Sequence, residues 1–451
     1  MTTPIKQRLF GTDGVRGEAG RFPLDAATIE TIGASLATRL GKAPLIVVGR
    51  DTRESGEWLE RALIAGALSQ GARCESAGVI TTPGVAFLTR SLGAQAGVVI
   101  SASHNPYQDN GVKIFAPSGR KLDDDTERLI EADIFTAQDS LQLKPERTLA
   151  TPDHSAELCS RYLTFLEKEI GAGLSLADQV IVVDTANGAA SQLAPELFAS
   201  LGARVIAINN QPDGRNINLN CGSLHIEGLQ QQVVASGATL GVAFDGDADR
   251  ALFVDAHGEF VDGDATLWVL ANNLHARGEL KQKLIVATVM SNIGLEIALR
   301  SRDLKLQRTD VGDKYVLEEL LRTGANLGGE QSGHIIFPSI SLAGDGMITT
   351  LCLLRAMTDE QKSLHMLTQG FQRFPQILVN IKVREKRPFS EVPAIKDLAG
   401  KTEALLGEKG RLLLRYSGTE SLARVMIEGE NQTDIERYAG DLAAVIQEQL
   451  G

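Results

Sequence analysis

Short apolar runs alternate with amphipathic stretches along most of the chain. The runs are rich in small and branched apolar residues, as buried strands are, and they occupy residues 44–49, 97–100, 179–184, 204–208, 284–289 and 335–337. Between them, apolar residues recur at helical spacing, which predicts helices over residues 55–71, from 191, after 291 and over 315–321. Strands that alternate with helices in this way indicate β-α-β units with mixed or parallel sheets.

The last part of the chain has a different pattern. Strands are expected at residues 375–383, 411–414 and 425–428, followed by an amphipathic helix over residues 434–450. These elements predict a smaller α+β unit at the C-terminal end.

The length of the chain, 451 residues, is too great for one ordinary domain. The expected boundaries lie in the polar stretch at residues 137–153, near residues 256–264 and near residues 370–375. They divide the chain into four expected domains, at residues 1–153, 154–256, 257–371 and 372–451.

Charge and hydropathy exclude two kinds of partner. The formal net charge is −12 and no segment gathers Lys and Arg into a stripe, so no nucleic-acid partner is expected. A small anionic substrate is compatible with this total, because a few arginines in one cleft can outweigh it. No apolar run approaches the ~20 residues that a membrane-spanning helix needs, and the N-terminus lacks an apolar signal stretch. We therefore expect no membrane partner and a cytoplasmic location.

A first polar, glycine-containing segment follows the apolar run at residues 97–100. It reads SASHNPYQDNGVKIF over residues 101–115 and places Ser103 in a turn just past a strand, where a nucleophile can be presented. A turn with a capping serine is the plain alternative. The density of polar groups, with His104 next in sequence and Lys113 further along, favours the nucleophile.

A second such segment, DGDADR, contains three carboxylates at alternate positions: Asp245, Asp247 and Asp249. Carboxylates so spaced can converge on one hard cation, and Mg²⁺ prefers oxygen ligands. An EF-hand is excluded, because its sixth and twelfth positions would be Arg250 and Ala256 instead of Gly and Glu. An aspartyl-phosphate phosphatase with Asp245 as the nucleophile stays open, as does a solvated acidic turn.

Two further segments carry groups suited to a phosphorylated sugar. In LGGEQSGHIIF, Glu330 and Ser332 offer oxygens to sugar hydroxyls, with His334 beside them. In RYSGTESLAR, a phosphate cradle is expected from arginine side chains, hydroxyls and backbone amides, at Arg415, Ser417, Gly418, Thr419 and Arg424. Each segment alone is also compatible with an ordinary glycine-containing turn.

In this order and spacing, the four segments resemble the α-D-phosphohexomutase superfamily over the whole chain. Residues 9–17 (LFGTDGVRG), the segment from Ser101 to Gly111 with Tyr107, and GGEQSGH most resemble the bacterial members that interconvert glucosamine 6-phosphate and glucosamine 1-phosphate. The resemblance implies three similar mixed α/β domains and a smaller α+β C-terminal domain around a central cleft.

The resemblance also assigns roles to the residues of each segment. Ser103 is expected to carry a phosphate and, with Asp245, Asp247 and Asp249, to coordinate Mg²⁺. Glu330 and Ser332 are expected to bind the sugar, and the residues from Arg415 to Arg424 its phosphate. The residues expected near the reacting phosphate and the metal loop are Arg16, His104, Lys113, Arg250 and His334.

The implied enzyme is an isomerase, an intramolecular phosphotransferase. Phosphorylated Ser103 would give its phosphoryl group to a sugar monophosphate and recover one from the resulting bisphosphate, with Lys113 or His334 moving the proton. Hexosamine or glucose 1,6-bisphosphate would prime it, a homodimer is expected, and the product would feed UDP-N-acetylglucosamine and peptidoglycan precursors. The alternatives are a phosphoglucomutase or phosphomannomutase, and a non-catalytic Mg²⁺-dependent phosphosugar-binding protein, although a binding protein would not need the nucleophile.

Overall fold

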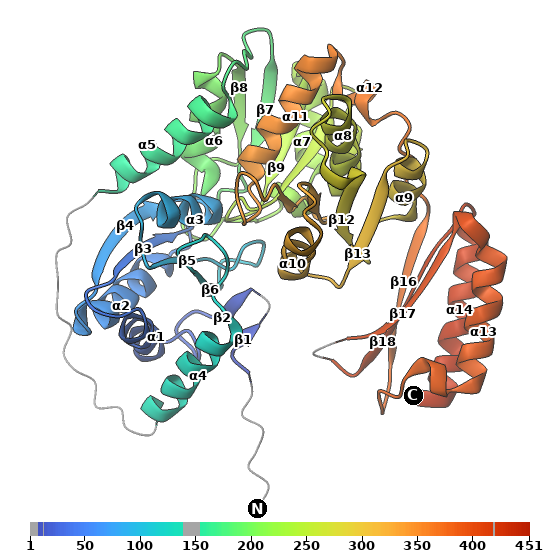
Figure 1. The fold of residues 1–451 in the computed structure, drawn as a ribbon, viewed down its shortest axis with the longest axis horizontal. Coiled ribbons are helices and arrows are strands. Elements are labelled where there is room, and N and C mark those ends of the chain that lie inside the picture. Colours follow the sequence, from blue (N-terminus) through green and yellow to red (C-terminus); the bar gives the residue numbers. More distant parts are fainter. Residues whose placement is uncertain (1–7, 12, 139–153, 418–419) are drawn as a thin grey trace, which may run out of the picture. The chain divides into compact units, whose positions relative to one another are not determined.

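The computed structural model describes residues 8–11, 13–138, 154–417 and 420–451. The chain forms two compact units, of which the first comprises residues 1–289 and 308–368 and the second residues 290–307 and 369–451 (Figure 1). None of the described helices is both long and apolar enough to cross a membrane.

The first sheet of the larger unit has the strand order β1-β2-β6-β5-β3-β4. Its strands are β1 (Phe10–Gly11), β2 (Gly14–Glu18), β3 (Leu45–Arg50), β4 (Arg73–Val79), β5 (Ala96–Ile100) and β6 (Asp109–Phe115). Strand β3 runs parallel to β4 and β5, whereas β6 is antiparallel to β5. The helices are α1 (Ala26–Arg39), α2 (Gly56–Ser69), α3 (Thr82–Ser91) and α4 (Asp124–Gln138).

Helices α1 and α2 approach each other backbone to backbone. A Cβ at Gly33 would lie 2.1 Å from the carbonyl oxygen of Leu63, and one at Gly66 would lie 1.9 Å from that of Glu30. Only glycine permits this contact, which brings the apolar faces of both helices into one core with β3 and β5.

The second sheet has the order β11-β10-β9-β7-β8. Its strands are β7 (Val180–Asp184), β8 (Arg204–Ile208), β9 (Leu240–Phe244), β10 (Ala251–Asp255) and β11 (Phe260–Val261), with helices α5 (Ser155–Phe165), α6 (Ala190–Ser200) and α7 (Glu227–Ser236). Every residue of β9 and β10 is buried, and the turn between these antiparallel strands is residues 245–250. The carboxylate segment therefore lies at the end of a hairpin whose two strands are fully buried.

A third set of strands completes the larger unit. Strand β12 (Leu284–Thr288) pairs in parallel with β14 (Gly328–Gly329), which pairs antiparallel with β15 (Ile335–Ile336). The division between the units falls within β13 (Lys305–Thr309). The helices are α8 (Gly263–Ala276), α10 (Asp313–Thr323), α11 (Gly346–Glu360) and α12 (Leu364–Thr368).

The smaller unit is an antiparallel sheet of order β16-β18-β17 with helices packed on it. Its elements are α9 (Ile293–Arg300), β16 (Gln376–Lys382), α13 (Pro393–Leu406), β17 (Arg411–Tyr416), β18 (Leu422–Glu428) and α14 (Gln432–Leu450). Helix α9 joins this unit through the buried Glu428, whose carboxylate accepts from the amide of Ile293 at 3.2 Å and pairs with Arg411 at 2.9 Å. The predicted fold class, α/β domains followed by a smaller α+β domain, is confirmed.

Candidate active site

Ser103 lies in the turn after β5 with a strained backbone. Its φ is +52°, in the left-handed region that costs a non-glycine residue about 1–3 kcal/mol, and it is 1% exposed. The Oγ atom donates to Asp245 Oδ2 at 2.5 Å and lies 3.3 Å from His104 Nδ1. The hydroxyl predicted to be the nucleophile therefore faces the carboxylate segment of the next domain.

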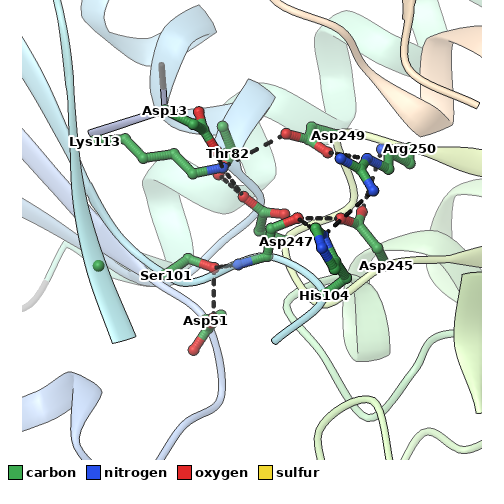
Figure 2. A network of polar contacts seen from close by, with 12 residues as sticks. Asp13, Asp51, Thr82, Ser101, His104, Lys113, Asp245, Asp247, Asp249 and Arg250 are labelled. Atoms are coloured by element: carbon green, nitrogen blue, oxygen red, sulfur yellow. Dashed lines mark hydrogen bonds and ion pairs between the residues drawn. The ribbon is translucent and has the colours of Figure 1, made fainter. Parts of the chain in front are cut away.

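The three aspartates lie at the turn between β9 and β10. They are all buried, and one carboxylate oxygen from each lies within 4.8 Å of those of the other two. Asp247 Oδ2 accepts from Thr82 Oγ1 at 2.5 Å and from Lys113 Nζ at 2.8 Å (Figure 2). Among the described residues, no hydrogen bond reaches Asp247 Oδ1 or Asp249 Oδ1, although both atoms are buried; Arg250 Nε lies 3.9 Å from Asp249 Oδ1. Buried acceptors left without a protein donor fit a bound cation.

These aspartates differ in their electrostatics. Burial raises the pKa of Asp245 well above its usual value, and the charges of Asp249 and Asp247 raise it further. Burial opposes ionisation of Asp249 as well, but Lys113 and His334 outweigh it and hold the pKa of Asp249 below its usual value. Three carboxylates in so small a space repel one another, so the cluster favours a divalent cation.

Lys113, on β6, is the buried cation of the site. Its Nζ lies 3.0 Å from Asp13 Oδ2 and 3.6 Å from Asp249 Oδ2, in addition to the contact with Asp247. Burial alone lowers the pKa of Lys113, but Asp13 and Asp247 raise it well above the ordinary value. Arg16 pairs with the same Asp13. Figure 2 shows Lys113 pointing toward the aspartate cluster beside Asp13.

The two histidines of the site have opposite electrostatic environments. Burial and the neighbouring Arg250 and Arg16 lower the pKa of His104 to about 4. Burial also disfavours charge on His334, but the carboxylate of Asp249, 3.7 Å from Nδ1, outweighs it and raises the pKa of His334 to about 9. The amide of Gly344 approaches Nε2 at 3.2 Å, a bond that only the neutral ring accepts. Several carboxylates outweigh that single amide, so the charged ring is favoured.

Glu330 and Ser332 lie in the tight turn between β14 and β15. Glu330 Oε1 accepts from the amide of Gly312 at 3.2 Å, and Ser332 Oγ is buried with no hydrogen-bond partner among the described residues. Gly333 has φ +89°, and its carbonyl accepts from the amide of Ala251, next to the aspartate turn, at 3.1 Å. The structure thus brings the Ser103 turn, the aspartate turn and this turn together in one unit.

Arg415 and Arg424 lie in the smaller unit, on β17 and β18. They are register partners, so two guanidinium groups stand directly across the sheet from each other. Ser417, at the end of β17, is buried, and its carbonyl accepts from Lys386 Nζ at 2.6 Å. The other two residues predicted for this cradle, Gly418 and Thr419, lie outside the described residues. Like charges directly opposite on a sheet repel each other, which favours a bound anion.

Several polar residues of the site were not predicted from the sequence. Asp13 joins Lys113, Arg16 and Lys121, and Lys121 also pairs with Asp313 at 2.7 Å. Asp13 lies within LFGTDGVRG, where an acid between two nearby glycines was a usable signal. Lys121 and Asp313 are 192 residues apart, and no local pattern connects them.

Four family models match the chain in series: the phosphoglucomutase/phosphomannomutase alpha/beta/alpha domains I at residues 7–140, II at 160–258 and III at 262–374, and the C-terminal domain at 378–445. The chain therefore belongs to the phosphoglucomutase/phosphomannomutase family. This confirms the resemblance inferred from the four polar segments.

Individual similar proteins indicate which members of the family this chain resembles. The chain is 49% identical over 447 residues to phosphoglucosamine mutase of Solibacter usitatus, covering 98% of this chain and 99% of the relative. A phosphoglucomutase/phosphomannomutase family protein of Burkholderia thailandensis shares the fold with TM-score 0.79 and 24% identity, covering 98% of each chain. N-acetylphosphoglucosamine mutase of Aspergillus fumigatus, solved with GlcNAc-6P and magnesium, has TM-score 0.64 at 18% identity, covering 99% of this chain and 96% of that one.

Proposed function

We propose that this chain is an isomerase that interconverts glucosamine 6-phosphate and glucosamine 1-phosphate through a phosphoserine at Ser103. The observation that carries the proposal is the 2.5 Å contact between Ser103 Oγ and Asp245, at a buried cluster of three carboxylates. A nucleophile beside a cation site is the arrangement that phosphoryl transfer requires. The relative named phosphoglucosamine mutase, which is similar over nearly the whole chain, supports this choice of sugar.

Asp245, Asp247 and Asp249 would hold Mg²⁺ together with a phosphate oxygen on Ser103. The two buried Oδ1 atoms without a protein donor and the mutual repulsion of the three acids support this assignment. When bound, the cation would neutralise charge on the transferring phosphoryl group.

The transfer itself is a balanced exchange. A sugar hydroxyl oxygen forms a bond to phosphorus while the bond from phosphorus to Ser103 Oγ breaks, and the proton of that hydroxyl ends on Ser103 Oγ. The reverse exchange with the other phosphate of the bisphosphate restores the phosphoserine. Hexosamine or glucose 1,6-bisphosphate would charge an unphosphorylated enzyme in the same way.

Lys113 and His334 are the two candidates for moving that proton. Both have raised pKa values in the resting site, so each holds a proton and can give it to an oxygen that leaves phosphorus. Arg16, Arg250 and His104 surround the same space, where the two arginines would neutralise phosphate charge.

Two other groups of residues would recognise the substrate. Glu330 and Ser332 would accept from or donate to sugar hydroxyls. The phosphate that does not react would bind the C-terminal cradle of Arg415, Ser417, Gly418, Thr419 and Arg424. The facing arginines of β17 and β18 support the cradle, since a phosphate would relieve their repulsion.

We also propose the wider setting inferred from the sequence. It comprises a cytoplasmic homodimer, four domains at residues 1–153, 154–256, 257–371 and 372–451, and a product that supplies UDP-N-acetylglucosamine for peptidoglycan. A phosphoglucomutase or phosphomannomutase is the closest alternative, because the same residues would serve either sugar.

The test compares three substrates with one enzyme preparation. Primed with the matching bisphosphate, the enzyme is expected to have the highest kcat/KM for glucosamine 6-phosphate, by roughly tenfold to a thousandfold over glucose and mannose 6-phosphates. The reason is that a polar contact at C2 of the sugar, once buried, penalises the sugar that leaves it unpaired. A preference of that size for glucose or mannose phosphate would leave the mutase class and remove the glucosamine assignment.

A further inference from the structure

Arg53 and Asp51 form an ion pair that no solvent reaches. They follow β3, the Arg53 Nη1 atom lies 3.0 Å from Asp51 Oδ2, and both side chains are 0% exposed. Burying two charges is costly unless their remaining hydrogen-bonding groups are also satisfied. The partners that satisfy them belong to the turn that carries Ser103.

The guanidinium of Arg53 donates hydrogen bonds to backbone carbonyls of that turn. Its Nη2 donates to Asn105 O at 2.6 Å and to Ser103 O at 3.2 Å, and its Nε donates to Asp109 O at 2.7 Å. From the domain of the second sheet, the side-chain Nδ2 of Asn218 donates to the same two carbonyls, of Asn105 at 3.0 Å and of Ser103 at 2.9 Å. Side chains from two domains therefore donate hydrogen bonds to the carbonyl groups of the turn.

Asp51 is linked to the backbone N–H of Ser103 through the hydroxyl of Ser101. Its Oδ2 accepts from Ser101 Oγ at 2.6 Å, and Ser101 Oγ accepts from the amide of Ser103 at 3.0 Å (Figure 2 shows Ser101 beside Asp51). The C=O of Ser103 is thus bonded directly to Arg53, and its N–H is linked through the Ser101 hydroxyl to Asp51, so both groups are connected to the same buried ion pair. A serine at φ +52° keeps that conformation only where its surroundings impose it.

We propose that Asp51, Arg53 and Ser101, assisted by Asn218, are positioning residues that impose the left-handed backbone of Ser103 and so aim its Oγ at Asp245. The inference rests on the proposed function of Ser103 as the phosphate carrier. It predicts that loosening this support slows phosphoryl transfer and leaves the binding of sugar and Mg²⁺ intact, because none of these side chains belongs to the sugar, phosphate or metal groups.

Ser101→Ala tests this with little disturbance, since it removes one hydroxyl and adds no volume. Ser76→Ala is the matched control: Ser76 Oγ also donates to a buried carboxylate of the same domain, on Glu60, but its other partner is the amide of Gly78. We expect kcat, and the rate at which glucose 1,6-bisphosphate phosphorylates Ser103, to fall about 10- to 100-fold in Ser101→Ala. KM and the Mg²⁺ concentration for half-maximal activity should stay within about twofold, and Ser76→Ala should match the wild type.

A second measurement does not depend on catalysis. Hydrogen–deuterium exchange of peptides that contain Ser103 should be faster in Ser101→Ala, and in Arg53→Lys, whose single nitrogen cannot reach three carbonyls, than in the wild type or in Ser76→Ala. Unchanged exchange, or a loss of kcat matched by equal weakening of sugar and Mg²⁺ binding, would overturn the positioning role. A wild type inactive on every hexose phosphate would refute the proposed function, and the exchange result would still decide whether this network holds the Ser103 turn.

Discussion

The Ser103 centre and the facing arginines of the C-terminal sheet differ in how deeply their charged groups are buried and in how closely those groups are paired. Around Ser103, buried groups of opposite sign are paired at close range, as Lys113 with Asp247 at 2.8 Å. On β17 and β18, Arg415 and Arg424 stand across from each other with like charge, both side chains are partly exposed, and Arg424 also pairs with the exposed Glu420 at 3.4 Å. The first arrangement is assembled before any substrate arrives, whereas the second would be stabilised by the phosphate that we propose it binds.

This difference supports our proposal that the two regions serve different steps, phosphoryl transfer at Ser103 and substrate binding at the arginine pair. Phosphoryl transfer needs reacting atoms held to within a fraction of an ångström, which a buried and cross-linked network supplies. The phosphate that does not react must be held in two orientations of the sugar. This task depends more on positive charge and on long, flexible side chains than on a rigid network. We therefore expect mutations at the first region to reduce kcat and mutations at the second to raise KM.

The largest effect is expected at the nucleophile. Ser103→Ala should lose the mass increment of one phosphate and lower turnover by about 10⁴-fold or more, because no other group can carry the phosphoryl. Intact mass spectrometry and a coupled mutase assay measure both quantities. The exposed Ser200, at the end of α6, provides the control Ser200→Ala, which should keep phosphate and activity.

Finding the phosphate on Asp245 would contradict this prediction. It would instead support the phosphatase interpretation of the aspartate segment.

A smaller but still large loss is expected from the carboxylates. Asp247→Asn should cut turnover by about 100-fold or more and weaken Mg²⁺ binding, since it removes a charged ligand from the cluster. Titration calorimetry with Mg²⁺ and the mutase assay test it, with the exposed Asp178→Asn as the control. Chelator should abolish wild-type activity and added Mg²⁺ restore it. Full activity in chelator would remove the metal assignment and leave Ser103 untouched.

The smallest effect on the chemical step is expected at the arginine pair. Arg424→Ala should raise KM about 10- to 100-fold with a lesser change in kcat, because it removes one charged contact to phosphate. Without ligand, the free energy of unfolding of the variant should change by less than about 1 kcal/mol, since the substitution removes both the repulsion from Arg415 and the exposed ion pair with Glu420. Steady-state kinetics and thermal unfolding with and without sugar phosphate measure these changes.

The control for this pair is Arg437→Ala, on the exposed face of α14, where the side chain is 62% exposed and pairs with Asp434. It should leave KM unchanged. An Arg424→Ala enzyme with reduced kcat and unchanged KM would contradict the proposed division between the two regions.

Strand and helix prediction succeeded where the pattern was local. The apolar run at residues 204–208 is β8, the run at 179–184 is β7 within one residue, and the helix predicted over 434–450 is α14. The prediction missed the seven-residue strands β4 and β6, in which polar residues interrupt the apolar run, and the two-residue strands β1 and β14, which are defined only by their partners. Two residues carry no periodicity, so pairing across the sheet is the only evidence for them.

The residues of the candidate site also fall into those that local sequence indicated and those that only the structure revealed. The sequence by itself determined which side chains are candidates for the chemistry, because Ser103, the three aspartates and Lys113 stand in dense polar segments at the ends of apolar strands. Only the tertiary structure decided which groups surround them. Asn218 reaches the Ser103 turn from 115 residues away, and Asp13 and Lys121 set the charge on and around Lys113. Local sequence dictates the hydrophobic periodicity and the turns of a chain. Long-range packing decides which buried carbonyls, cations and carboxylates come into contact, and these contacts set the pKa values and impose the strained backbone conformations.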